Sequence, residues 1–138
     1  MKTTIGSMEQ KIFDIMTVAP VTVDMQDAVY KVEEVLNEHG LSSVPVIDPE
    51  RRDCFGIISL KDIAHFNAAK KNSRAVRAWE MCSYKPQTAD PEASIEDVAR
   101  LMVEHRIHHV VVVENGLLKG FVSSLDIIAA CLPLRSRK

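Results

Sequence analysis

The sequence has no long apolar run and only three cysteines, and each shortage excludes a class of protein. No stretch of its 138 residues approaches the ~20 consecutive apolar residues that a membrane-spanning helix needs. Residues 1–13 lack the apolar core of a secretory signal. Cys54, Cys82 and Cys131 show no C-x-x-C spacing, so neither a disulfide framework nor a zinc ribbon is indicated. We therefore expect a cytoplasmic protein with reduced thiols and no membrane association.

Enzyme signatures and excess positive charge are also missing. Only five glycines are present, and neither G-x-x-x-x-G-K-[ST] nor G-x-S-x-G occurs. The net charge of −2 gives no electrostatic argument for nucleic acid, and the short basic stretches near Lys70 and at residues 133–138 suit solvated surface. We expect neither catalysis nor nucleic-acid binding by this chain.

What the sequence does contain is an internal repeat of roughly 65 residues. Adding 66 to a residue number in the first half repeatedly gives the same amino acid, as for Pro20, Thr22, Asp24, Val32, Glu38, His39, Val44 and Val46. After a hairpin loop two residues shorter, adding 64 places Gly56, Ser59, Asp62 and Ile63 on Gly120, Ser123, Asp126 and Ile127. The matches follow one another in order, which indicates a duplicated unit.

Each copy predicts the order strand–helix–strand–strand–helix. The first copy gives these elements over residues 20–24, 27–39, 43–47, 54–59 and 60–69, after one or two helical turns over 11–16. In the second copy a strand over 86–90 and a helix over 94–105 precede two Val-rich strands around Asn115-Gly116, a hairpin signal, and a helix from 124. The periodicity predicts that Gly40 ends the first long helix and that Ser94 caps its counterpart.

The predicted fold class is α/β (α+β), with two repeats that must pack together because each alone buries too little surface. We expect a flexible N-terminus over 1–10, a first repeat over 11–69, a linker over 70–77, a second repeat over 78–132 and a basic tail over 133–138.

Two Ser–Asp pairs, Ser59 with Asp62 and Ser123 with Asp126, occupy the predicted strand-to-helix junctions. Such a junction presents a hydroxyl, a carboxylate and free backbone N–H groups together, which suits a ribose and a phosphate. The alternative is that each Asp is simply a helix-start residue favoured by the macrodipole. Thr22 and Thr88 likewise suit ordinary strand positions as well as ligand contact.

The motifs h-P-V-h-D (residues 44–48) and G-h-h-S-x-x-D (residues 56–62 and 120–126) resemble the CBS domain, the module named after cystathionine β-synthase. The resemblance covers residues 11–132 and both copies, and the second copy is most similar to the last repeat of the AMP-activated protein kinase γ subunit. It implies a pseudo-twofold-related pair of β-α-β-β-α repeats, called a Bateman module. In that family such a pair binds adenosine ligands in the clefts between the repeats.

The resemblance also implies roles for individual residues. Asp62 and Asp126 would hold ribose hydroxyls, with Ser59 and Ser123 near ribose or phosphate. Thr22 and Thr88 would lie near the base, whose other contacts are mainly backbone, and Val44, Pro45 and Val110 lie on the strands concerned. His108 matches a phosphate-contacting histidine of the kinase subunit, whereas His109 stands where that subunit has arginine. The first repeat has Ser42-Ser43 in place of these two histidines.

The expected function is a regulatory sensor that binds AMP, ADP or ATP, needs no obligatory cofactor, and passes occupancy to an unidentified partner or a homodimer interface. The rivals are a structural dimerisation module without ligand, and a binder of S-adenosylmethionine or NAD. A zinc site at His105, His108 and His109 is not expected, because a helix end separates these imidazoles.

Overall fold

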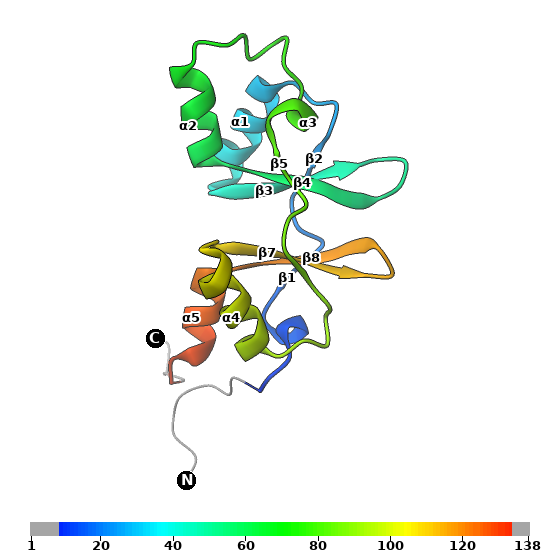
Figure 1. The fold of residues 1–138 in the computed structure, drawn as a ribbon, viewed down its shortest axis with the longest axis vertical. Helices are drawn as coiled ribbons and strands as arrows, with labels where there is room; N and C mark the ends of the chain where they lie inside the picture. The colour runs from blue at the N-terminus through cyan, green and yellow to red at the C-terminus, as the bar shows by residue number, and fades with distance from the viewer. Residues whose placement is uncertain (1–8, 134–138) are drawn as a thin grey trace. The chain divides into compact units, whose positions relative to one another are not determined.

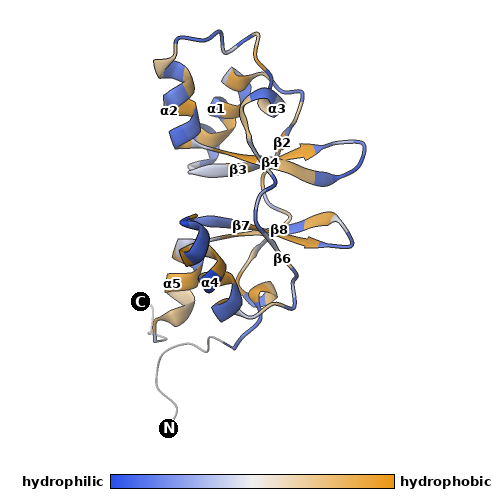
Figure 2. Cartoon of the chain, in the orientation of Figure 1, coloured by the Kyte–Doolittle hydropathy of each residue, from blue (hydrophilic) through white to orange (hydrophobic). Residues whose placement is uncertain are grey.

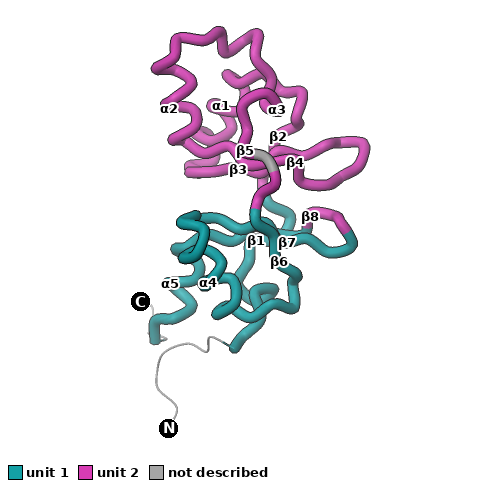
Figure 3. The backbone as a smooth tube through the Cα atoms, in the orientation of Figure 1, with its two compact units in different colours: residues 1–20, 87–115, 119–138 teal, residues 21–86, 116–118 magenta. Residues whose placement is uncertain are grey.

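The computed structural model describes residues 9–133, apart from the side chain of Tyr84. They form two compact units (Figure 3). Unit 2 consists of residues 21–86 with 116–118, and unit 1 of the described parts of residues 1–20, 87–115 and 119–138. Between residues 9 and 133, none of the helices has both the length and the apolar composition that crossing a bilayer requires.

Unit 2 contains a four-stranded sheet and three helices (Figure 1). Its elements are β2 (Val23–Asp24), α1 (Val29–His39), β3 (Ser43–Asp48), β4 (Asp53–Ser59), α2 (Leu60–Ala68), α3 (Ala78–Met81) and β5 (Ser83–Tyr84). The strand order is β2-β3-β4-β5, with β2 parallel to β3 and the other two pairs antiparallel. The apolar faces of α1 and of the sheet share one buried cluster, in which Val29, Val32 and Leu36 are at most 1% exposed.

Unit 1 repeats this plan. Its elements are η1 (Ile12–Asp14), β1 (Thr17–Val18), β6 (Thr88–Ala89), α4 (Ile95–His105), β7 (His109–Glu114), β8 (Leu117–Ser123) and α5 (Ser124–Cys131), with β8 belonging to unit 1 from residue 119 on. The strand order is β1-β8-β7-β6, with β1 antiparallel to β8 and β6 parallel to β7. Asn115 and Gly116 have φ of 53° and 79°, as a two-residue hairpin turn with the favoured twist requires.

The predicted helices and hairpins are present, with small shifts at their ends. Gly40 ends α1 in the left-handed conformation, with φ of 62°, and the Ser94 hydroxyl caps α4 by accepting the Asp97 N–H at 3.0 Å. The helix predicted from residue 27 begins at Val29, because the Asp27 carboxylate closes a turn by accepting the Asp24 N–H. The strands predicted over 20–24 and 86–90 are two residues each, and Thr22 lies just before β2.

The two sequence repeats exchange the segments that precede them: each segment packs in the unit built by the other repeat. Sequence reasoning did not reveal this exchange. Strand β1, from the start of the chain, pairs with β8 of the second copy, and β5, which precedes the second copy, pairs with β4 of the first. The first helical N–H groups of α4 and α1 are satisfied by the carbonyls of Gln10 and Val76, at 2.8 Å and 3.0 Å. The segment over residues 9–20 therefore packs within unit 1, although the sequence repeat that follows it builds unit 2.

This exchange explains the glycine that opens each G-h-h-S-x-x-D motif. A Cβ on Gly56 would meet the Ser83 carbonyl and would lie 2.7 Å from the Cys82 sulfur, while a Cβ on Gly120 would meet the Met16 side chain. Cys82 and Met16 are corresponding positions of the repeat, and both are buried where an exchanged segment crosses the sheet. Glycine leaves room for that crossing.

We predict that Gly56→Ala destabilises the protein by about 1–3 kcal/mol, because the added methyl group meets a backbone carbonyl that cannot move aside. Gly120→Ala is the matched control at the corresponding position. Its methyl group meets only the flexible Met16 side chain, so it should cost less. Urea denaturation of the two variants measures the difference, and equal costs would contradict this explanation.

Candidate functional site

The two Ser–Asp junctions have the same geometry. At the start of α5, Asp126 Oδ2 accepts the Ser123 N–H at 2.8 Å and Ser123 Oγ accepts the Asp126 N–H at 3.2 Å. At the start of α2 the corresponding distances for Ser59 and Asp62 are 2.8 Å and 3.1 Å. Each pair is thus a reciprocal capping box that fixes the point where the strand becomes a helix.

These boxes leave fewer free donors than the sequence suggested. The N–H of Ser124 donates to the His108 carbonyl at 2.8 Å, and the N–H of Leu60 donates to the Ser42 carbonyl at 2.9 Å. The third helical N–H, on Asp126 or Asp62, donates to the serine hydroxyl of the capping box. Of the first three N–H groups of each helix, the second, on Leu125 or Lys61, therefore has no hydrogen-bond partner within residues 9–133. The expectation of several free N–H groups for a phosphate was therefore wrong: the chain's own carbonyl and hydroxyl groups occupy them.

Each aspartate nevertheless keeps one oxygen available. Oδ2 of Asp62 and of Asp126 is engaged by the capping box, whereas Oδ1 of each has no hydrogen-bond partner in the described part of the chain. Both residues are only half-buried, so a ligand hydroxyl can reach this oxygen. The structural and the ligand-binding interpretations of these residues are therefore compatible.

His108 and His109 lie beside the α5 junction. His109 begins β7 and stacks on Phe121 of β8, with ring centroids 5.0 Å apart and planes at 14°. Burial lowers the pKa of His109 below its ordinary value of 6.5; His108 lowers it further, and Asp126 opposes the shift. His109 is therefore largely neutral at neutral pH, while the exposed His108 is held next to α5 by its carbonyl.

The other predicted site residues occupy varied environments. Val44 and Val110 are fully buried in the two cores and Pro45 is buried beside Val44, so their side chains are not available to a ligand. Thr22 is half-buried and Thr88 is exposed in β6. The predicted residues divide between the units: Thr22, Val44, Pro45, Ser59 and Asp62 belong to unit 2, and Thr88, His108, His109, Val110, Ser123 and Asp126 to unit 1.

Metal and thiol chemistry find little support in the described residues. No three His, Cys, Asp or Glu side chains in residues 9–133 are grouped as a metal ion requires. Burial raises the pKa of the Cys54 and Cys82 thiols to about 11, so both are protonated at neutral pH. A protonated thiol is a poor nucleophile.

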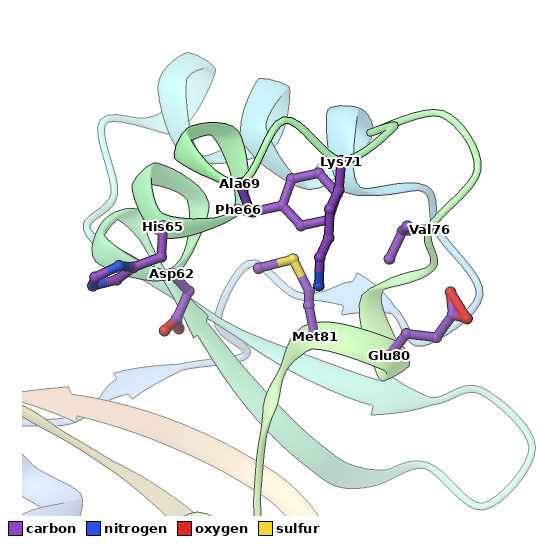
Figure 4. Close-up of a pocket in the computed structure, with 8 residues that line it drawn as sticks. All are labelled: Asp62, His65, Phe66, Ala69, Lys71, Val76, Glu80 and Met81. Atoms are coloured by element: carbon purple, nitrogen blue, oxygen red, sulfur yellow. The ribbon is translucent and has the colours of Figure 1, made fainter.

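A groove of about 460 Å³ in unit 2, which sequence reasoning missed, begins at Asp62 (Figure 4). One stripe of α2 and its continuation line one side, through Asp62, His65, Phe66 and Ala69. Lys71, Val76, Glu80 and Met81 line the other. The helical spacing of the first set was visible in the sequence, whereas the approach of Glu80 and Met81 follows from the exchanged segment.

The duplicated elements match a known family. The model described as CBS domain matches residues 12–68 and again residues 78–133. These matches span most of the chain, which therefore belongs to the CBS domain family and carries a tandem pair of these modules.

Similar proteins agree with this assignment. YlbB of Bacillus subtilis, an uncharacterised protein, is 26% identical over 117 residues, which cover 85% of this chain and 79% of YlbB. Hypoxic Response Protein I with two coordinated zinc ions has a TM-score of 0.79 at 26% identity, covering 90% of this chain and 100% of that one. CBSX2 in complex with AMP gives 0.78 at 22% identity, covering 88% and 95%. The CBS domain of a bacterial CNNM/CorC family Mg²⁺ transporter in complex with ATP gives 0.79 at 19%, covering 89% and 87%. The predicted fold is thereby confirmed.

The lowered pKa of His109 predicts a pH effect on stability. The unfolded chain, with the higher pKa, binds this proton more tightly, so the folded state loses stability as the pH falls from neutrality through 6.5 towards the lower folded value. His109→Phe keeps a ring against Phe121 but does not titrate. As the pH falls from about 7.5 to about 5.5, the free energy of unfolding of His109→Phe should therefore rise relative to that of the parent. His105→Gln controls for the loss of one histidine, and a pH-independent difference for His109→Phe would contradict the prediction.

Proposed function

We propose that this chain is a regulatory module that binds an adenine nucleotide at the Ser–Asp junctions of its CBS repeats and transmits occupancy to a partner or a dimer interface. The observation that carries the proposal is the duplicated junction, in which one oxygen of Asp62 and of Asp126 is fixed and the other is available. The AMP in CBSX2 and the ATP in the transporter domain support this ligand class.

The available carboxylate oxygen is the ribose contact. A charged acceptor makes stronger hydrogen bonds with hydroxyl groups than a neutral one does. Because the capping box already holds the carboxylate in place, little conformational freedom is lost when the ligand binds.

Phosphate attraction at the second repeat is modest. His108 is exposed beside the junction, His109 is largely neutral, and one N–H, on Leu125, remains for the anion. A site of this kind suits micromolar affinity, about −8 kcal/mol. Regulation then follows from differential affinity: the nucleotide stabilises the conformation that binds it better, and the partner responds to that conformation.

We predict that AMP, ADP or ATP raises the melting temperature of the purified protein. At 100 times the dissociation constant a ligand adds about 2.7 kcal/mol, which corresponds to several degrees. Asp126→Asn keeps an oxygen for the capping box but removes the charge, so it should weaken nucleotide binding at least tenfold, or by ~1.4 kcal/mol. Asp97→Asn removes the same charge at the third position of α4 and should leave binding unchanged.

A protein that no adenine nucleotide stabilises at millimolar concentration would contradict the proposal. S-adenosylmethionine and NAD belong in the same assay, because a shift with either alone would change the ligand class. No shift with any of them would favour a structural dimerisation module.

An apolar stripe on α5 supports self-association. Leu125 and Ile128, with Leu132 just after the helix, are 73%, 54% and 58% exposed. The corresponding positions on α2 are Lys61, Ala64 and Ala68, and Figure 2 shows the same contrast in hydropathy between the two helices. A stripe without charge can pair with its own copy across a twofold axis, because no like charges meet.

We predict that Ile128→Glu makes the protein monomeric, because a carboxylate would be buried without a partner in the paired stripe. Ala64→Glu introduces the same charge at the corresponding exposed position of α2 and should leave the oligomeric state unchanged. Sedimentation velocity measures both variants. A parent protein that is already monomeric, or a dimer that survives Ile128→Glu, would contradict this role for α5.

A further inference from the structure

The groove in unit 2 is open to solvent and large enough to take a small molecule. Its volume of about 460 Å³ lies within the range of roughly 300–1,000 Å³ that ligand pockets occupy. Phe66, Ala69, Val76 and Met81 supply apolar surface, and charged groups stand around them. Its end at Asp62 coincides with the first Ser–Asp junction, so a ligand held there extends into the groove.

Lys71 is the cation in this groove that is free to bind an anion. Figure 4 shows its side chain extending from the segment after α2 into the groove, whereas the His65 ring points away from the other lining side chains. Lys71 has no ion pair or hydrogen bond within residues 9–133. Glu80, which also lines the groove, uses its carboxylate as a cap by accepting the Arg77 N–H at 2.7 Å.

The first repeat lacks the two histidines that stand beside the junction of the second repeat. Ser42 and Ser43 stand at the positions of His108 and His109. At the start of α2, the Ser42 carbonyl accepts the Leu60 N–H and the Ser59 hydroxyl accepts the Asp62 N–H. At this junction only the Lys61 N–H remains for an anion among the first three helical N–H groups, so further attraction must come from side chains of unit 2.

We infer that Lys71 binds the anionic group of a ligand whose hydroxyl groups bind Asp62, and that the groove takes a nucleoside monophosphate. The inference rests on the proposed function and deepens it by assigning the first repeat its own anion contact. A lysine ammonium serves phosphate as a point charge without fixed bidentate geometry. Lys71 is exposed, so its contribution is moderate, about threefold to fivefold in the dissociation constant.

The test isolates the first-repeat site by using Asp126→Asn as the parent and measures AMP and adenosine binding by isothermal titration calorimetry. Lys71→Gln in this parent should weaken AMP binding about threefold to fivefold and change adenosine binding less than about twofold. Lys61→Gln is the matched control, because Lys61 is exposed on the first turn of α2 beside Asp62 but does not line the groove. It should leave both ligands unaffected. The melting temperatures of the ligand-free variants, compared with the parent, confirm that the fold is intact.

The outcomes separate this inference from the proposed function. If the unsubstituted protein binds no adenine nucleotide, both fall together. If that protein binds AMP but the Asp126→Asn parent does not, the first-repeat site is overturned while the second remains. If Lys71→Gln matches the parent, or if Lys61→Gln weakens AMP equally, the assignment to Lys71 is wrong. A loss confined to Lys71→Gln and to AMP supports it.

Discussion

The reciprocal hydrogen bonds between serine and aspartate at the two strand-to-helix junctions constrain both the fold and the site. Each box fixes the first residue of α2 or α5, so the direction of the helix follows directly from the end of β4 or β8. At each junction the same bonds engage one carboxylate oxygen and two N–H groups, which are then not available to a ligand. At each junction one oriented carboxylate oxygen and the second helical N–H remain without a hydrogen-bond partner in the described part of the chain. Under the proposed function, one aspartate side chain therefore both caps a helix and contacts a ribose.

Most of the fold was predictable because its signals are local. Helical periodicity, the left-handed Gly40 and the Asn115-Gly116 turn each act within a few residues, and the structure has each where the sequence indicated. The exchange of the segments around Met16 and Cys82 was not predictable, because strand pairing between distant segments leaves no local pattern in two-residue strands. The glycine that opens each repeated motif indicated that another segment packs closely there, but a glycine alone does not identify that segment.

The candidate site was predictable to a similar extent. The Ser–Asp pairs have the junction positions that their spacing indicated, because a capping box is itself a local device. The burial of Val44 and Val110 follows from their place in apolar strands, because side chains in such strands pack into the core. The groove escaped prediction for the same reason as the exchange: Glu80 and Met81 approach α2 because α3 and β5 pack in unit 2.

The differences between the repeats are informative, because corresponding residues occupy the same positions in the same fold. Unit 1 places two histidines before its central strand and an apolar stripe on α5, whereas unit 2 has two serines, a polar α2 face and a groove with a free lysine. Under the proposed function each junction binds the ribose of a nucleotide through its aspartate, but different groups attract the phosphate at the two junctions. Their affinities then differ, and occupancy rises in two steps as nucleotide concentration increases. Because only unit 1 carries the apolar stripe, the step at Asp126 lies on the same helix as the self-association surface, and that is the step a dimer can sense most directly.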